Sequence, residues 1–142
     1  MPSDFFSFTV SGLNIEFSTD NICEKAFRLF KKKFNIPNVK IHLHKMIPIG
    51  AGLGGGSSNG SFVLKGLNEL FNLKLSKDQL NEHALILGSD CPFFIDNKAK
   101  YVQGIGNDLT EIDLDLSDFV IEIIDPKIHI STVDAYKIIK PK

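Results

Sequence analysis

The sequence lacks the features that mark secreted and membrane-spanning proteins. It has only two cysteines, Cys23 and Cys91, which lie far apart and form no Cys-x-x-Cys motif. This usage predicts two ordinary buried thiols in a reducing cytosol rather than a disulfide framework. No apolar run approaches the ~18 residues of a membrane span, and the N-terminus has no basic segment followed by an apolar one. We therefore expect a cytoplasmic protein.

An excess of charge of either sign is also absent. Sixteen basic and seventeen acidic residues leave a net charge of −1, so the overall field favours neither nucleic acid nor an anionic membrane. Any anion-binding site must therefore be local. The 142 residues, 43% of them hydrophobic, contain no linker or repeat and are enough for one domain, residues 1–142, with a buried core.

What the sequence does contain is a glycine-rich stretch at residues 46–59, which holds five of the eleven glycines. Glycine has no Cβ, so such a run lets backbone N–H groups approach a bulky anion, most often phosphate. Ser57 and Ser58 follow where the N-cap of a helix is expected, and the free amides and positive dipole end of that helix would face the same anion. A plain glycine-rich connector is the alternative.

Three known phosphate loops do not fit this stretch. Gly50, Gly52 and Gly55 satisfy G-x-G-x-x-G, but Glu69, at the spacing of the acidic residue in a dinucleotide fold, lies within a helical pattern. A Walker loop needs a lysine after its last glycine, and Gly56 is followed by serine. The H-R-D and D-F-G motifs of protein kinases are missing from the sequence. The stretch therefore predicts a phosphate loop of another type.

In the rest of the chain, apolar residues recur either at helical spacing or at every second position. Apolar spacing and capping residues predict helices from Asp20 or Asn21 to Phe34, from the glycine-rich stretch to Phe71, from Ser76 to Gly88, and a short one from Ser131. Alternation and apolar runs predict strands at residues 4–10, 13–17, 39–45, 93–95, 98–102, 109–112 and 119–125. The first two strands are expected to form a hairpin around Ser11-Gly12, and residues 119–125 a central strand.

Asp90 stands between the glycine that ends the third predicted helix and Pro92. An acid in this position is most often a turn or cap former. The functional alternative is a carboxylate at the mouth of the predicted strand 93–95, placed to accept a hydrogen bond from a substrate hydroxyl. The residues by themselves leave both interpretations open.

Other polar candidates lie near the predicted phosphate loop. His42 and His44 project together from the strand at 39–45; a zinc site is conceivable, but the lack of a third ligand nearby in sequence favours a solvated face. Lys45 ends that strand, so a cation lies close to the expected phosphates. Asn21 is interpreted as a helix cap.

Residues 48–58, Pro-Ile-Gly-Ala-Gly-Leu-Gly-Gly-Gly-Ser-Ser, resemble the nucleotide-phosphate motif of the GHMP small-molecule kinases, which include galactokinase, homoserine kinase and mevalonate kinase. Residues 87–94, 104–106 and 130–136 are similar to the branch that phosphorylates a cytidine diphosphate alcohol in non-mevalonate isoprenoid biosynthesis. The resemblance runs from about Asp20 to the last residue. It implies an α+β, two-layer, ribosomal-protein-like sandwich with a left-handed βαβ crossover.

The resemblance also implies roles for individual residues. ATP would be held by Asn21, Lys45, Pro48, Ile49, Gly50, Ala51, Gly52, Leu53, Gly54, Gly55, Gly56, Ser57 and Ser58. Asn21 would hold the adenine, and Lys45 would lie beside the base. Asp90 would be the catalytic base, and Tyr136 would stack on the cytosine of the substrate. The reaction would use ATP and Mg²⁺, and no residue is assigned as a metal ligand.

Members of this family have a strand with a catalytic lysine before the matched region and a second domain after it. The chain thus resembles a middle segment, incomplete at both ends, for which we expect unpaired strand edges and an exposed apolar face. Weak ATP binding at best and no phosphate transfer are expected of this chain alone. Asn107 departs from the glutamate that is usual in the family.

Two alternative functions remain open at this point. One is another kinase of the same superfamily, acting on a mevalonate-like or sugar substrate. The other is a non-catalytic nucleotide-binding fragment.

Overall fold

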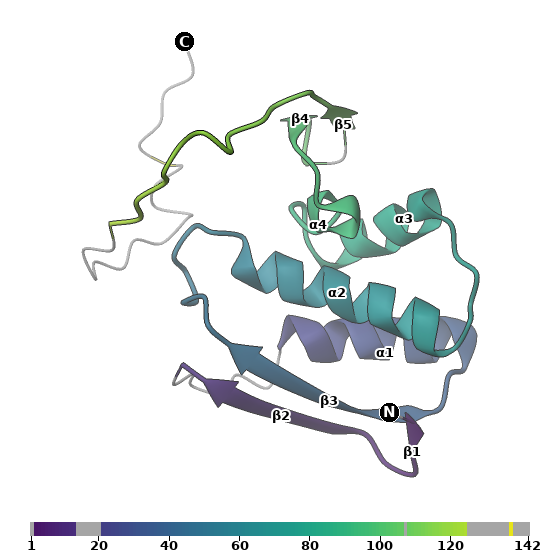
Figure 1. Cartoon of the computed structure of the whole chain (residues 1–142). Helices are drawn as coiled ribbons and strands as arrows, with labels where there is room; N and C mark the ends of the chain where they lie inside the picture. Colours follow the sequence, from purple (N-terminus) through teal and green to yellow (C-terminus); the bar gives the residue numbers. More distant parts are fainter. Residues whose placement is uncertain (1, 14–20, 107, 125–136, 138–142) are drawn as a thin grey trace.

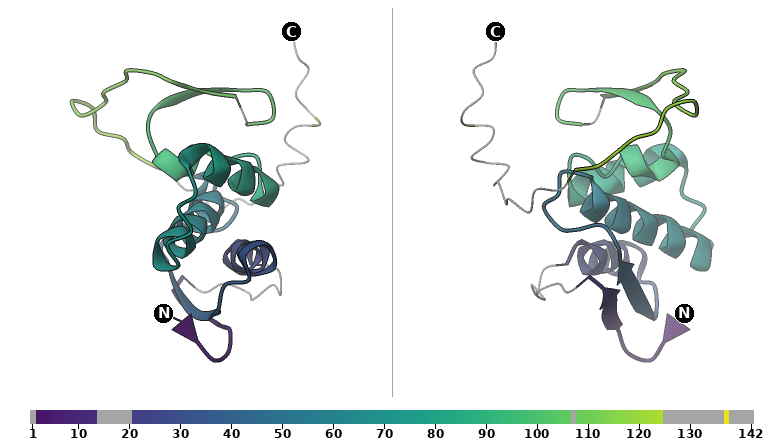
Figure 2. Two further views of the ribbon diagram at one scale, coloured as in Figure 1. Left: turned by 90° about the vertical axis from the view of Figure 1, so that its right-hand side faces the viewer. Right: turned by 60° about the vertical axis from the view of Figure 1, so that its left-hand side comes forward.

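The structure, a computed structural model, describes residues 2–13, 21–106, 108–124 and 137. Strands β1 (Pro2–Ser3), β2 (Ser7–Gly12) and β3 (Asn38–Lys45) form one sheet in the order β1-β3-β2. Helices α1 (Ile22–Phe34), α2 (Gly55–Leu70), α3 (Lys77–Leu87) and α4 (Phe93–Asp96) lie on one side of it (Figure 1). Strands β4 (Lys100–Gln103) and β5 (Asp108–Glu111) pair as a separate hairpin, which lies beyond the helices from the sheet (Figure 2).

Strands β2 and β3 are parallel, and α1 connects them as a βαβ unit. Ser11 pairs with His44 and Gly12 with Lys45, so both residues belong to a strand. The predicted hairpin turn at Ser11-Gly12 is therefore wrong, because the pairing with β3 continues through it. Its second strand, predicted at residues 13–17, lies almost entirely outside the described residues. The left-handed sense of the crossover stays a prediction.

Strand β3 has the two faces that its sequence predicts. Val39 and Lys45 are buried, and the apolar residues between them at alternate positions are half-buried. Val39 belongs to the core that β3 shares with the helices, and Ile41 packs against that core. His42 and His44 are exposed on the other side, as predicted for a solvated face, and both rings hydrogen-bond the Ser11 hydroxyl at 2.9 Å. The alternation fixes the register of β3 and points Lys45 toward the helices.

Local capping signals set the ends of α1 and α3 as predicted. The Asn21 side chain accepts a hydrogen bond from the Cys23 amide at 2.9 Å, and the last turn of α1 carries the three lysines of residues 31–33. Ser76 and Gln79 form a reciprocal capping box at the start of α3. None of the helices in the described residues is both long and apolar enough to cross a membrane.

The core lies between β3 and helices α1, α2 and α3. Its buried members are Ala26, Phe27, Phe30, Ile36, Val39, Leu64, Leu67, Leu80, Ala84, Cys91 and Ile95. Helix α2 contributes the stripe of Gly60, Leu64 and Leu67 that its spacing predicts, and it also packs against α1, α3 and α4. Because α2 is fixed on several sides, the position of its N-terminus is fixed too.

Residues 93–95, predicted as a short strand, form the helical turn α4 instead. Pro92 has helical dihedrals (φ −57, ψ −34), and the Asn97 amide donates to the Phe93 carbonyl at 3.1 Å. Asn97 ends the turn in the left-handed conformation. Proline suits the first turn of a helix, and this local preference outweighs the apolar run that suggested a strand.

The predicted strands at 98–102 and 109–112 are confirmed as β4 and β5, but residues 119–124 form no strand. Val120 is 98% exposed and Ile124 82% exposed. A central strand needs partners on both sides, and no strand in the described residues pairs with this segment, so an apolar composition is not sufficient. Residues 119–124 are thus an exposed apolar segment, whereas the exposed apolar face expected from an incomplete first sheet stays a prediction. Tyr136 and most of the short helix predicted from Ser131 lie outside the described residues.

Candidate functional site

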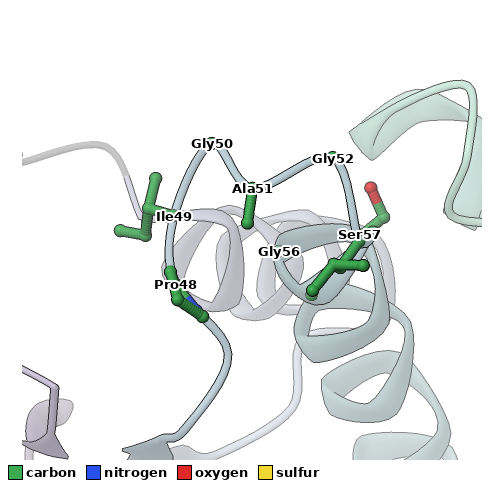
Figure 3. Close-up of a pocket in the computed structure, with 10 residues that line it drawn as sticks. Pro48, Ile49, Gly50, Ala51, Gly52, Gly56 and Ser57 are labelled. Carbon is green, nitrogen blue, oxygen red and sulfur yellow. The ribbon is translucent and has the colours of Figure 1, made fainter. Parts of the chain in front are cut away.

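The glycine-rich loop arches from the end of β3 to the start of α2 (Figure 3). Residues 48–57 line a cavity of about 200 Å³ under the arch. Figure 3 shows Ile49 turned away from this cavity. Pockets for complete small-molecule ligands begin near ~300 Å³, so the cavity suits the phosphate part of a nucleotide better than a whole nucleotide.

Three alternate glycines give this loop its shape. Gly50, Gly52 and Gly54 have φ angles of 73, 71 and 65, in the left-handed region. Residues with a Cβ rarely adopt this conformation, so glycine is required by the path of the chain. Left-handed residues in such turns direct backbone N–H groups into a concavity, which is the geometry of anion-binding loops.

Helix α2 begins at Gly55 with Gly54 as its N-cap, so the prediction that Ser57 and Ser58 form the cap is wrong. The left-handed turn at Gly54 brings the chain into the helix before the serines. The first helical hydrogen bond runs from Ser58 N to Gly54 O at 2.9 Å, and no side chain caps the helix. The amides of the first three helical residues therefore have no acceptor within α2, and they offer donors and a positive dipole end to an anion.

Lys45 lies directly beneath this helix end. Its side chain is buried, with the residue 5% exposed, and Nζ donates to Asn59 Oδ1 at 2.9 Å. A Cβ placed on Gly55 would be 3.3 Å from Nζ. None of the ion pairs found among the described residues involves Lys45. A buried ammonium that pairs with no carboxylate of the described residues, next to a helix N-terminus, gives this region a positive potential that an anion would neutralise.

Burial controls the ionisation of Lys45 and of the neighbouring Cys23. Desolvation lowers the pKa of the Lys45 ammonium below its ordinary value, and the Cys23 thiol opposes that shift. Burial raises the pKa of Cys23 to about 11, with Lys45 opposing. Cys23 is therefore a neutral thiol near neutral pH. Both cysteines are free and buried, as the sequence predicts.

We expect Lys45→Met to weaken ATP binding about tenfold near neutral pH while raising the free energy of unfolding by about 0.5 to 2 kcal/mol, because a buried charge is removed. In the unsubstituted chain the pKa of Lys45 lies below the ordinary lysine value of 10.5. Its ammonium therefore loses its proton in a pH range below that of an ordinary lysine. ATP affinity should then fall as the pH rises through that range, and Lys45→Met should abolish this fall. Calorimetric titration with ATP at several pH values measures both effects.

Lys40→Met is the matched control, since Lys40 is exposed on the opposite face of β3. It should leave the affinity and its pH dependence unchanged. An equal loss in both variants would mean that Lys45 has no special role.

Asn21 is a helix cap in the structure, and a contact with adenine stays a prediction. Asn21→Ala should lower the free energy of unfolding by about 1 kcal/mol, whereas Asn21→Asp should leave it unchanged because a carboxylate caps equally well. If the amide also donates to adenine, Asn21→Asp should weaken ATP binding several-fold. Urea unfolding and ATP titration of both variants separate the two roles, and an unchanged ATP affinity in Asn21→Asp would leave only the cap.

Asp90 is exposed in the turn between α3 and α4 and faces a second cavity, of about 320 Å³. The other residues that line this cavity are Gly52, Leu53, Gly54, Ser89, Phe93, Phe94, Val102 and Gly106. Gly52, Leu53 and Gly54 thus border both cavities. The structure brings Asp90 and the glycine-rich loop to the walls of one cavity, although they are far apart in the sequence.

Two close contacts hold the Asp90 turn beside the loop. A Cβ on Gly54 would be 2.7 Å from Phe94 Cζ, so this ring packs directly on the loop. Gly106 has φ +94, and a Cβ there would be 2.3 Å from the Ser89 carbonyl oxygen. The tip of the β4–β5 hairpin therefore packs on the turn. This close contact explains why the Gly104-Ile-Gly106 motif has glycine at position 106. Sequence reasoning missed Phe94 as a lining residue because it placed it in a strand.

Residues 21–98 match the protein family described as GHMP kinases N terminal domain. The chain therefore belongs to the GHMP kinase family, and the predicted α+β fold class is confirmed. Its relatives point to one member of that family. The chain is 50% identical over 130 residues to the 4-diphosphocytidyl-2-C-methyl-D-erythritol kinase of Azobacteroides pseudotrichonymphae, covering 91% of this chain and 49% of that protein. It is 47% identical over 132 residues to the kinase of the same name from Bacteroides fragilis, covering 92% and 48%.

A solved structure gives the same result. The crystal structure of a 4-(cytidine 5'-diphospho)-2C-methyl-D-erythritol kinase superposes with a TM-score of 0.66 at 31% sequence identity. The match covers 81% of this chain and 41% of that one. The chain spans about half the length of the curated relatives it matches.

Proposed function

We propose that this chain supplies the nucleotide-binding part of a 4-diphosphocytidyl-2-C-methyl-D-erythritol kinase, which transfers the γ-phosphate of ATP to the 2-hydroxyl of its substrate. The observation that carries the proposal is the shared wall of the two cavities, Gly52 to Gly54. One cavity lies under the phosphate-loop arch and the other contains Asp90. A donor phosphate and an acceptor hydroxyl bound in these cavities would therefore lie beside the same three residues. The names of the relatives support the choice of substrate.

The chemistry needs little covalent work from the protein. Phosphoryl transfer requires that the hydroxyl be aligned with the phosphorus, that the developing charge be stabilised, and that a group accept the proton. The amides of residues 55–57 and the Lys45 ammonium would stabilise the charge. Asp90 would accept the hydroxyl proton, for which an ordinary carboxylate is sufficient.

Magnesium would supply further charge neutralisation at the phosphates. The described residues contain no group of three His, Cys, Asp or Glu side chains that could hold a metal ion. Mg²⁺ is usually bound through one or two carboxylates together with substrate phosphates, so the phosphate oxygens of ATP would supply most of its ligands. We therefore propose MgATP as the nucleotide, with the metal held mainly by its phosphates.

The test compares acceptors in a form that has the full length of the relatives. With MgATP, 4-diphosphocytidyl-2-C-methyl-D-erythritol should be phosphorylated, whereas mevalonate and galactose should not. Phosphorylation of mevalonate or a sugar instead would favour another kinase of the superfamily. ATP binding without transfer to any of the three would favour a non-catalytic nucleotide-binding role.

The 142-residue chain by itself is proposed to bind ATP weakly and to transfer no phosphate. Tyr136 is proposed to stack on the cytosine of the substrate. A cytoplasmic location is also proposed, from the cysteine usage and from the class of reaction. Calorimetric titration of the chain with ATP and Mg²⁺ measures its share of the nucleotide affinity.

A further inference from the structure

Ser61 connects the two halves of the candidate site from inside the core. It lies on α2, one turn after the free amides, and is fully buried. Its hydroxyl donates toward the Ser57 carbonyl at 2.9 Å and toward the Cys91 carbonyl at 2.7 Å, as a three-centre hydrogen bond. The first acceptor belongs to the first turn of α2, and the second directly follows Asp90.

The bond to Cys91 crosses from one element to another. The contact within α2 is the usual bond of a helical serine to the carbonyl four residues before it and does not fix any other part of the chain. The contact with Cys91 is the shorter of the two and joins residues 30 positions apart in the sequence. It is also fully buried, so water does not compete for the carbonyl.

The Asp90 turn also contacts the glycine-rich loop and the β4–β5 hairpin. Phe94 packs on the loop at Gly54, and the Ser89 carbonyl contacts Gly106 of the hairpin. Both are contacts of shape, and both involve residues that line the cavity. The backbone hydrogen bonds of the turn are local: the Cys91 amide donates to the Gly88 carbonyl at 3.1 Å, and the Phe94 amide donates to the Cys91 carbonyl at 3.0 Å. Ser61 contacts the turn from the opposite, buried side and does not line either cavity.

We propose that Ser61 is a positioning residue of this kinase: its hydroxyl holds the backbone at Cys91 and so sets the place of the Asp90 carboxylate relative to the amides at the start of α2. This inference rests on the proposed function, in which Asp90 accepts the proton of the acceptor hydroxyl. A residue with this role affects the alignment of the two substrates but not the binding of ATP. Small misplacements of reacting groups cost up to about a hundredfold in rate.

The test is Ser61→Ala in a form with the full length of the relatives, assayed with MgATP and 4-diphosphocytidyl-2-C-methyl-D-erythritol. We expect kcat to fall about tenfold to a hundredfold, with the KM for ATP unchanged within about threefold. Ser61→Cys, which keeps the size and a weaker donor, should give an intermediate kcat. In the 142-residue chain, Ser61→Ala should speed amide hydrogen exchange at residues 88–94.

Asn68→Ala is the matched control. Like Ser61, Asn68 is a residue of α2 whose side chain bonds to backbone outside the helix: it accepts a hydrogen bond from the Leu75 amide at 3.0 Å. It lies at the C-terminal end of α2, far from the candidate site. It should lower the thermal midpoint of unfolding and leave kcat unchanged. A similar loss of kcat in both variants would reduce Ser61 to a stabilising residue and overturn the inference.

The outcomes separate this inference from the function on which it rests. Suppose that the unsubstituted enzyme transfers phosphate and that Asp90→Asn abolishes this transfer. If Ser61→Ala then retains full kcat, the inference alone fails. A rise in the KM for ATP without a loss of kcat also overturns it. If the unsubstituted enzyme transfers no phosphate, or Asp90→Asn retains turnover, the proposed function fails and the inference fails with it.

Discussion

Replacing Asp90 with asparagine should lower kcat by about a hundredfold to ten-thousandfold in a form with the full length of the relatives, while the affinity for ATP stays within about threefold. Asparagine has nearly the same shape but cannot accept the proton of the acceptor hydroxyl. Asp90 is exposed in its turn, and its carboxylate accepts only a long hydrogen bond, 3.4 Å from the Ser89 hydroxyl, among the described residues. The substitution should therefore leave the fold unchanged.

Steady-state kinetics of phosphate transfer and calorimetric binding of ATP measure the two expectations for Asp90→Asn. Asp113→Asn is the control, since this carboxylate is exposed in the segment that follows β5. It should change neither quantity. A loss of less than about tenfold in Asp90→Asn would show that the carboxylate is not the base, and a parallel loss of ATP affinity would assign it to nucleotide binding.

Gly54→Ala is expected to produce the largest loss of stability in the glycine-rich loop. Alanine at φ +65 costs about 1 to 2 kcal/mol, and its Cβ would be 2.7 Å from Phe94 Cζ, an overlap that costs about 1 to 3 kcal/mol more. The free energy of unfolding should fall by about 2 to 5 kcal/mol. ATP affinity should fall by at least about tenfold, because the N-cap of α2 and the free amides after it are displaced.

Two other glycines separate the causes of this effect. Gly52 has φ +71 but open space at its Cβ position, so Gly52→Ala tests backbone strain alone and should cost about 1 to 2 kcal/mol. Gly66 lies within α2 with open space and no positive φ, so Gly66→Ala should stabilise the chain by up to about 1 kcal/mol. Urea unfolding followed by circular dichroism measures all three. Equal effects in Gly54→Ala and Gly52→Ala would contradict the role of the Phe94 contact.

Local signals in the sequence were sufficient to predict where most of the helices lie. The caps at Asn21 and Ser76 act within a few residues of themselves, so spacing alone locates them. The same reasoning was wrong at Ser57 and Ser58. There the left-handed conformation of Gly54, which a sequence does not display, starts the helix earlier. The glycine-rich loop itself was predicted correctly as the opening of a long helix, while its role with ATP stays a proposal.

Long-range relations were less accessible to sequence reasoning. The apolar residues 119–124 have the composition of a central strand, but strand pairing depends on neighbours that composition does not reveal. The contact of Phe94 with Gly54 and the bond of Ser61 to Cys91 arise from the packing of α2 against α4 and the Asp90 turn. Asp90 could be singled out by its motif, whereas the residues that hold it in place could not.

The common wall formed by Gly52, Leu53 and Gly54 has a consequence for inhibition. A compound that links an anionic group to an acceptor mimic across this wall would occupy both cavities at once. Because the second group would then bind at a high effective concentration, such a bisubstrate compound should exceed the affinity of either half by a wide margin.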